Sequence, residues 1–150
     1  MPNVGISKVI GLLELVHDEG DEVETARVAL DLDLEFDALL PVLEAAKTLG
    51  FVEIKSGKIR LTRDGKKLVA SGIAARRKFL RKRLAGVRLF KDVFALLQKR
   101  KRVKRRSLVK YCRLKLPKSE AEKTVDTIVN WGRNAEAIGY DSGKQELYAL

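Results

Sequence analysis

The 150-residue sequence has very few of the residues that enzymes and metal proteins rely on. It contains one histidine, His17, and one cysteine, Cys112. A single cysteine excludes an internal disulfide, and no Cys/His pair has the spacing of metal ligands. The G-x-S-x-G nucleophile motif and the G-x-x-x-x-G-K-[ST] phosphate loop are also absent. We therefore expect that the chain is not an enzyme and that it holds no metal or other cofactor.

Long apolar runs are also missing. No stretch approaches the roughly 20 apolar residues that are needed to cross a bilayer, so we expect no transmembrane segment. The N-terminus, "MPNVGISKVIGLLELVHDEG", has neither a basic n-region nor a small-residue cleavage site, so we expect no signal peptide. The single cysteine suits a reducing compartment, and the sequence predicts a cytoplasmic protein.

Positive charge is abundant but confined to the middle of the chain. Residues 1–72 carry nine Lys/Arg and thirteen Asp/Glu, a net charge of −4. Residues 73–118 carry nineteen Lys/Arg and one acid, a net charge of +18. Residues 119–150 carry three Lys/Arg and six acids, a net charge of −3. A basic block of this kind often marks contact with nucleic acid or with an anionic membrane surface.

Apolar spacing predicts three helices and a β-hairpin in the first half. Ser7 is the expected N-cap of the first helix, and Gly50 is the expected stop of the third. The alternating segment "FVEIKSGKIRLT" predicts two strands that turn at Ser56-Gly57. The expected helices cover residues 7–17, 25–32 and 36–49, and a closing helix lies within 62–72.

The second half predicts the same order again. After a connecting helix over 73–86, residues 88–97 have helical spacing, and the run "KRKRVKRR" that follows is too charged to bury. Ser107 is the expected cap of a short helix to Leu114. Ser119 and Glu122 predict a capping box for a longer helix, within which we expect Trp131 to be buried, as is Cys112 before it. The final hairpin is expected to turn at Ser142-Gly143.

The tripeptide Ser-Gly-Lys occurs at 56–58 and at 142–144, an offset of 86 residues. At that offset the apolar matches are Leu39 with Val125, Val42 with Ile128, Leu43 with Val129, and Leu61 with Leu147. We predict a mainly α fold with small β-hairpins, built as tandem winged helix-turn-helix units joined by a helix. The expected units are residues 1–72 and 87–150, and the basic connecting helix covers 73–86.

Two segments resemble a known family. They are "LDLEFDALLPVLEAAKTLGFVEIKSGKIRLTRDGKKL" and "EAEKTVDTIVNWGRNAEAIGYDSGKQELY". Together they are similar to the AAA-associated C-terminal domain, which is appended to the ATP-binding subunits of nitrate/sulfonate/bicarbonate-type ABC transporters. The resemblance spans roughly residues 12–149 and implies tandem winged helices with an ABC ATPase as partner. Because the sequence has no ATP-binding cassette, we expect a free-standing member of this family.

The basic block is the candidate nucleic-acid site. The two expected third helices, residues 36–49 and 119–131, contain no Arg and carry acids, so base readout should be weak and contact with phosphates should dominate. In these helices Thr127 and Asn130 are the candidate base readers. The expected phosphate contacts are Lys58, Arg60, Arg76, Arg77, Arg81, Lys82, Arg83, Arg88, Lys99, Arg100, Lys101, Arg102, Lys104, Arg105 and Arg106.

The sequence therefore leaves three alternative functions open. The first is a nucleic-acid-binding protein, with DNA favoured over RNA, of the kind found among transcription regulators. The second is a protein-interaction or regulatory module for an ABC ATPase or another acidic protein. The third is peripheral contact with an anionic membrane through the amphipathic basic helix at 73–91. The connecting helix would also suit a homodimer seam, and the sequence leaves the oligomeric state open.

Overall fold

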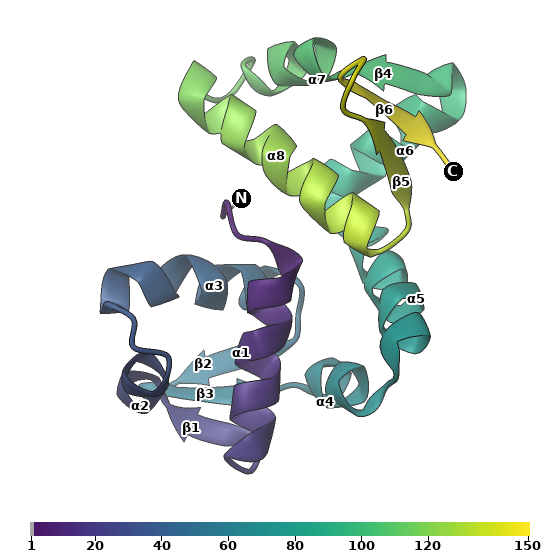
Figure 1. Ribbon diagram of the computed structural model, residues 1–150. Helices are drawn as coiled ribbons and strands as arrows, with labels where there is room; N and C mark the ends of the chain where they lie inside the picture. The colour runs from purple at the N-terminus through teal and green to yellow at the C-terminus, as the bar shows by residue number, and fades with distance from the viewer. Residues whose placement is uncertain (1) are drawn as a thin grey trace. The chain divides into compact units, whose positions relative to one another are not determined.

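The computed structural model describes residues 2–150, which fold into two compact units, Pro2–Arg76 and Arg77–Leu150. The described residues are mainly helical with small antiparallel hairpins, which confirms the predicted fold class (Figure 1). The first unit contains α1 (Ile6–Asp18), β1 (Glu22–Glu24), α2 (Thr25–Asp31), α3 (Phe36–Thr48), β2 (Val52–Lys55), β3 (Lys58–Leu61) and α4 (Arg63–Ala70).

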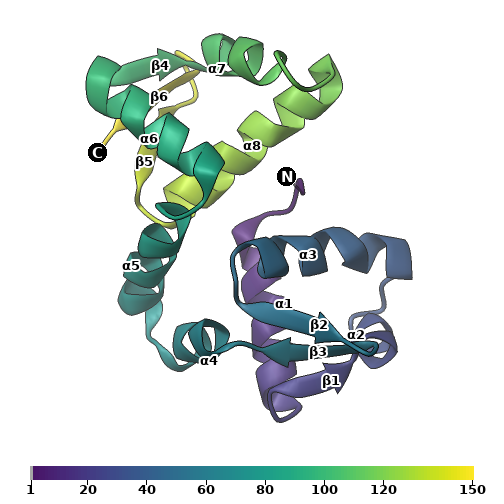
Figure 2. The ribbon, with the colours of Figure 1, turned by 180° about the vertical axis from the view of Figure 1, so that it is seen from behind.

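Helix α5 (Ile73–Leu84) contains the boundary between the units. The second unit continues with α6 (Arg88–Arg100), β4 (Arg102–Lys104), α7 (Arg105–Cys112), α8 (Lys118–Asn134), β5 (Ile138–Asp141) and β6 (Glu146–Ala149). Figure 2 shows both units from behind.

In the first unit, α1 and α3 pack together, and both contact the three-stranded sheet. The strand order is β1-β3-β2, so β3 is central and pairs antiparallel with both neighbours. The core is closed by fully buried apolar side chains, among them Leu13, Leu39, Phe51 and Ile59. The β2–β3 turn falls at Ser56 and Gly57 as predicted, with φ of 52° and 74°, the signature of a tight two-residue hairpin.

The second unit repeats this order, and its strand order is β4-β6-β5. Trp131 of α8 is fully buried and stacks on Phe90 of α6, with ring centroids 6.2 Å apart and planes 2° apart. Cys112 is also buried, at 7% exposure. Burial of both residues in this unit confirms the prediction for each.

Hydrogen bonds and register define the repeat better than sequence does. Val23 pairs with Ile59 in the first sheet as Val103 pairs with Leu147 in the second. Asp21 and Lys101 precede these first strands with positive φ, 71° and 67°. Leu61 N donates to Asp21 O, and the equivalent Ala149 N donates to Lys101 O. The two units therefore share topology and backbone detail.

Two strands were not expected, and one sequence match is wrong. The charged run at 99–106 is mostly exposed as expected, but Arg102–Lys104 within it forms strand β4, which buries Val103 between exposed cations. The equivalent strand β1 was also not expected. The match of Leu61 with Leu147 fails, because the second hairpin has a four-residue turn, two residues longer than the first, so Leu147 corresponds to Ile59.

The predicted caps are also wrong. Helix α1 starts at Ile6 after Gly5, so Ser7 lies inside the helix. Helix α7 starts after Lys104, and α8 starts after Pro117, which places Ser107 and Ser119 in their first turns. The residues at the N-cap positions are Gly5, Lys104 and Pro117, whose backbones are extended. The sequence alone does not show that these residues, and not the serines, precede the helices. Thr62 does cap α4, since its hydroxyl accepts from Gly65 N at 3.1 Å.

Candidate interaction surfaces

The two units have opposite net charges. Residues 2–76 carry ten Lys/Arg and thirteen Asp/Glu, net −3, whereas residues 77–150 carry twenty-one Lys/Arg and seven Asp/Glu, net +14. This division follows the fold and is sharper than the total of +11 suggests. Each unit therefore has its own electrostatic character.

Arg76, a predicted phosphate contact, is a structural residue. Its guanidinium donates to the carbonyls of Leu68, Val69 and Ser71 at 2.9–3.1 Å, where α4 ends. It also pairs with Glu14 of α1 at 2.9 Å, and its side chain is only 24% exposed. These contacts tie the first turn of α5 to the first unit and leave little of the guanidinium for a ligand.

Several other predicted contacts are engaged inside their own unit. Arg77 pairs with Glu136, and Arg81 donates to the Ala135 carbonyl at the end of α8. A cation at a helix C-terminus is stabilised by the orphan carbonyls there. The remaining pairs are Arg102 with Glu146 and the face of Tyr148, Arg105 with Asp126, and Arg60 with Glu22.

The other members of the predicted set lie at the surface, apart from the half-buried Arg83. Most of the exposed ones gather where α6 ends, along the edge strand β4 and at the start of α7. Arg102 and Lys104 lie on the face of β4 opposite the buried Val103, so their side chains are exposed. The exposed residues are Lys58, Lys82, Arg88, Lys99, Arg100, Lys101, Lys104 and Arg106.

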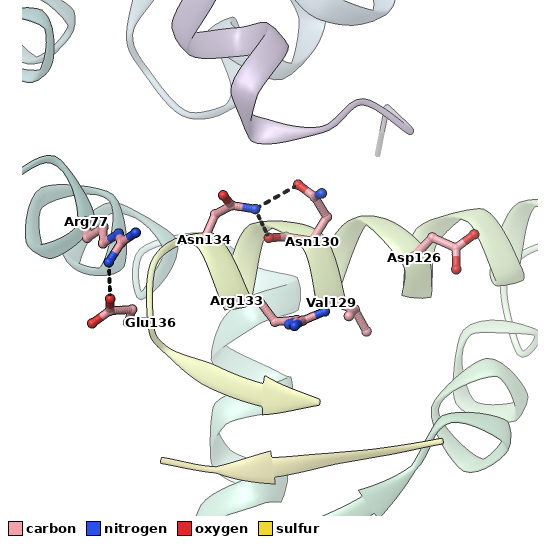
Figure 3. A pocket seen from close by; sticks show the side chains of 7 residues that line it. All are labelled: Arg77, Asp126, Val129, Asn130, Arg133, Asn134 and Glu136. Carbon is pink, nitrogen blue, oxygen red and sulfur yellow. Dashed lines mark hydrogen bonds and ion pairs between the residues drawn. The ribbon is translucent and has the colours of Figure 1, made fainter. Parts of the chain in front are cut away.

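The outer face of α8 forms a hollow of about 490 Å³ with mixed charge (Figure 3). Asn134 donates to the Asn130 carbonyl at 2.8 Å, and Asp126 and Arg133 line the same surface. Thr127, the other candidate base reader, is 1% exposed and donates to the Lys123 carbonyl. Thr127 is therefore unavailable to a nucleic acid, whereas Asn130 is exposed.

The turn between α2 and α3 exposes a concentration of large apolar side chains. Leu30 is 80% exposed and Phe36 is 53% exposed, although both lie in helices of the first unit. Leu32, Leu34 and Leu40 are each 37–39% exposed nearby in the chain. Exposed acids alternate with them. We call this set the acidic turn surface: Leu30, Leu32, Leu34, Phe36 and Leu40 with Asp31, Asp33, Glu35 and Asp37.

The equivalent turn in the second unit, between α7 and α8, is also apolar but carries cations. Leu114 is 79% exposed and Tyr111 is 51% exposed. They line a largely apolar hollow of about 410 Å³, which a second hollow of about 350 Å³ adjoins at Asp92 and Tyr111. We call this set the basic turn surface: Leu89, Tyr111, Leu114 and Leu116 with Arg88, Lys110, Arg113, Lys115 and Lys118.

The one histidine and the one cysteine of the sequence lie in different units. His17 lies at the end of α1 and its Nδ1 is 2.7 Å from Asp21 Oδ1 at an exposed position. Burial raises the pKa of the Cys112 thiol above its ordinary value of 9.0, which disfavours the nucleophilic thiolate. Among residues 2–150 there is no group of three or more His, Cys, Asp and Glu that could hold a metal ion.

Residues 26–141 match the family described as the C-terminal AAA-associated domain. The chain belongs to this family. Neither the curated proteins nor the solved structures gave a match. In the part of the chain that the structure describes, no helix is both long and apolar enough to span a membrane.

In this AAA-associated domain, several residues of the recognised segments have structural roles. Gly65 of the "TRDG" run lies so close to the Phe51 carbonyl that a Cβ would overlap it. The Thr62 hydroxyl that caps α4 also donates to Gly50 O at 2.6 Å. Gly132 of "NWGR" brings α8 against Ile138, since a Cβ there would fall 2.5 Å from that side chain.

The matched region also includes both turn surfaces, which we did not predict. The signal was present as two alternations, "DLDLEFD" at 31–37 and "RLKLPK" at 113–118. Neither alternation has helical spacing, so neither would bury its leucines on one helix face. Each run overlaps the end of one expected helix and connects it to the next, and leucines that are exposed in such a connection often mark contact with a partner.

Proposed function

We propose that this AAA-associated domain is a protein-interaction module that binds an ABC-type ATP-binding subunit through the acidic turn surface. The observation that carries the proposal is the group of five large apolar side chains, each 37–80% exposed, within residues 30–40 at the end of α2, the turn and the start of α3. Exposed apolar side chains that gather in this way mark protein contacts. The family supplies the class of partner, and the sequence resemblance to ABC transporter domains supplies the kind of ATPase.

The acids on this surface exclude a polyanion as its ligand. Asp31, Asp33, Glu35 and Asp37 are all exposed and would repel phosphates. A protein partner with an apolar, basic surface would cover the leucines and pair with the acids at the rim. The proposal therefore assigns binding energy to the apolar side chains, and orientation and association rate to the carboxylates.

Nucleic-acid binding is the second candidate. We infer that each unit is a winged helix-turn-helix, because helix, strand, two helices and a hairpin follow one another in both. The exposed cations from Lys99 to Arg106 favour contact with phosphates. Against this, the third helices α3 and α8 expose Asp37, Glu44, Glu120 and Glu122, and six of the fifteen predicted cations are engaged within the protein.

Membrane contact through α5 has little support. Leu80 and Leu84, the apolar stripe of that helix, are 3% and 0% exposed. Only Ile73 remains open, at 72% exposure. One isolated apolar side chain does not anchor an interfacial helix. We also propose that the domain is not an enzyme, since His17 pairs at the surface and Cys112 is a buried thiol with a raised pKa.

Calorimetric titration with a nitrate/sulfonate-type ATP-binding subunit at physiological salt tests the proposal. The double variant Leu30→Gln, Phe36→Gln should weaken binding about 100-fold, because two large side chains lose roughly 1.5 kcal/mol each of burial. The matched control is Ile73→Gln, which removes an apolar side chain of similar exposure outside the surface. Equal affinity for both variants would contradict the proposal.

A duplex DNA titration in the same buffer separates the two candidates. The module proposed here should bind DNA weakly, and the Leu30→Gln, Phe36→Gln variant should bind it as well as the wild type. Binding to DNA that is tighter than binding to the ATP-binding subunit would favour the second candidate. Its salt slope would then report how many phosphates are neutralised.

A further inference from the structure

The two turn surfaces are built on the same pattern with opposite charge. In the first unit, acids alternate with leucines at Asp31-Leu32-Asp33-Leu34. In the second unit, cations alternate with leucines at Arg113-Leu114-Lys115-Leu116. Both runs start at the end of the second helix of their unit and lead into the third. Both units therefore have an apolar turn between their second and third helices. The charge of this turn is negative in the first unit and positive in the second.

The surfaces also differ in a way that suits them to each other. The acidic turn surface offers protruding side chains, with Leu30 80% exposed. The basic turn surface offers two adjoining apolar hollows of about 410 and 350 Å³. Either hollow has room for a leucine or phenylalanine side chain, and the first is lined by the two cations Arg88 and Lys115 and by one acid, Asp92. Apolar groups can then be buried while the charges pair around them.

We propose that a second copy of this chain is the occupant of the basic turn surface, which receives the acidic turn surface of its partner. Each copy carries one surface of each kind, so a two-fold dimer satisfies all four at once. The opposite net charges of the units, −3 and +14, favour the same pairing. The inference rests on the proposed function in that it takes the acidic turn surface to be a protein contact.

Dimer formation would regulate the binding of the ATP-binding subunit to the acidic turn surface. The dimer covers the side chains, such as Leu30 and Phe36, through which the ATP-binding subunit is bound. Dimer and subunit therefore compete for one surface. A rise in the concentration of the chain should lower the share that is available to the subunit, by mass action.

Sedimentation equilibrium of the full chain, with three charge variants, tests the pairing. Variant A is Asp31→Lys, Asp33→Lys, Asp37→Lys, and variant B is Arg113→Glu, Lys115→Glu, Lys118→Glu. The wild type should reach twice its 16.8 kDa mass. Each variant alone should stay monomeric, with dissociation constants raised by about 100-fold or more, because like charges then face each other. An equimolar mixture of A and B should again form a dimer.

Variant B separates specific pairing from general repulsion. It lowers the net charge from +11 to about +5, which by itself would favour association. The matched control is Arg63→Glu, Lys66→Glu, Lys67→Glu on α4, which makes the same change in charge at exposed positions and should still dimerise. A chain that combines A and B should dimerise too.

Three results would overturn the inference. One is a wild type that remains monomeric at all concentrations. The second is a dimer that variant B strengthens. The third is a chain with both A and B substitutions that stays a monomer and becomes more compact. The acidic and the basic turn surfaces would then pair within one chain and not between two copies. A monomer that still binds the ATP-binding subunit through Leu30 and Phe36 would leave the proposed function standing.

Discussion

Leu114 lies in the second unit at the place that Leu34 holds in the first, 80 residues apart like the strand residues Val23 and Val103, and both leucines are exposed between the second and third helices. Asp33 precedes Leu34, and Arg113 precedes Leu114. A turn that only connected two helices would not need apolar side chains in solvent, where their exposure has a cost. Their recurrence in both repeats is the reason why we propose that the domain binds its partner through these turns and not through the cations of the basic block.

Arg76 should matter for stability and not for ligand binding. Arg76→Ala removes four hydrogen bonds of the guanidinium, and the carbonyls of Val69 and Ser71 lose this donor, whereas Leu68 O still accepts from Ser71 N. We expect a loss of about 1.5–3 kcal/mol in the free energy of unfolding, measured by chemical denaturation. Arg76→Lys should recover little of it, because an ammonium cannot reproduce the planar fork.

Lys78, two residues further along α5, is the control for Arg76. It is exposed, so Lys78→Ala should change the free energy of unfolding by less than about 0.5 kcal/mol. Equal effects of the two substitutions would show that the contacts of Arg76 do not hold in solution.

Two glycines in helices should respond to alanine with opposite signs. A Cβ at Gly65 would overlap the backbone carbonyl of Phe51, so Gly65→Ala should destabilise the first unit by at least about 1 kcal/mol. A Cβ at Gly11 meets nothing within 4 Å, and α1 gains helix propensity, so Gly11→Ala should stabilise by about 0.5–1 kcal/mol. Thermal unfolding of both variants against the wild type would check the signs. Stabilisation by Gly65→Ala would refute the close contact.

The buried thiol predicts a pH dependence. Burial raises the pKa of Cys112 in the folded chain above its ordinary value of 9.0. As the pH rises past 9, the unfolded chain releases this proton first, so the free energy of unfolding should fall. Cys112→Ala removes that contribution, so the free energy of unfolding of the variant should fall less steeply above pH 9 than that of the wild type. A thiol reagent should also react slowly with the native protein at pH 7.

The sequence allowed prediction of nearly all helices, both hairpins and the burial of Trp131, because these depend on period and on local turn residues. It did not reveal β1 and β4, each of which has only three residues and buries one valine. Such short strands form because Val23 and Val103 pair with a central strand far away in sequence. The helix caps failed for a related reason, since Gly5 and Pro117 precede the helices where Ser7 and Ser119 were expected.

The candidate site was harder to predict than the fold. Fifteen cations were identified by type and by their position in a basic block, but type does not show which of them pair inside the fold. Arg105 with Asp126 and Arg81 with the Ala135 carbonyl join residues 21 and 54 positions apart. The exposure of Leu30 also depends on tertiary packing, because its spacing in α2 fits a buried face equally well.

Backbone amide shifts of the labelled chain, followed while an unlabelled ABC-type ATP-binding subunit is added, test the central claim most directly. The account predicts that the perturbed amides cluster at residues 30–37 in the turn between α2 and α3. Residues 99–106 should change little, and duplex DNA should not reproduce the pattern. Perturbation confined to 99–106, or the absence of any change at a saturating concentration of the subunit, would contradict the account.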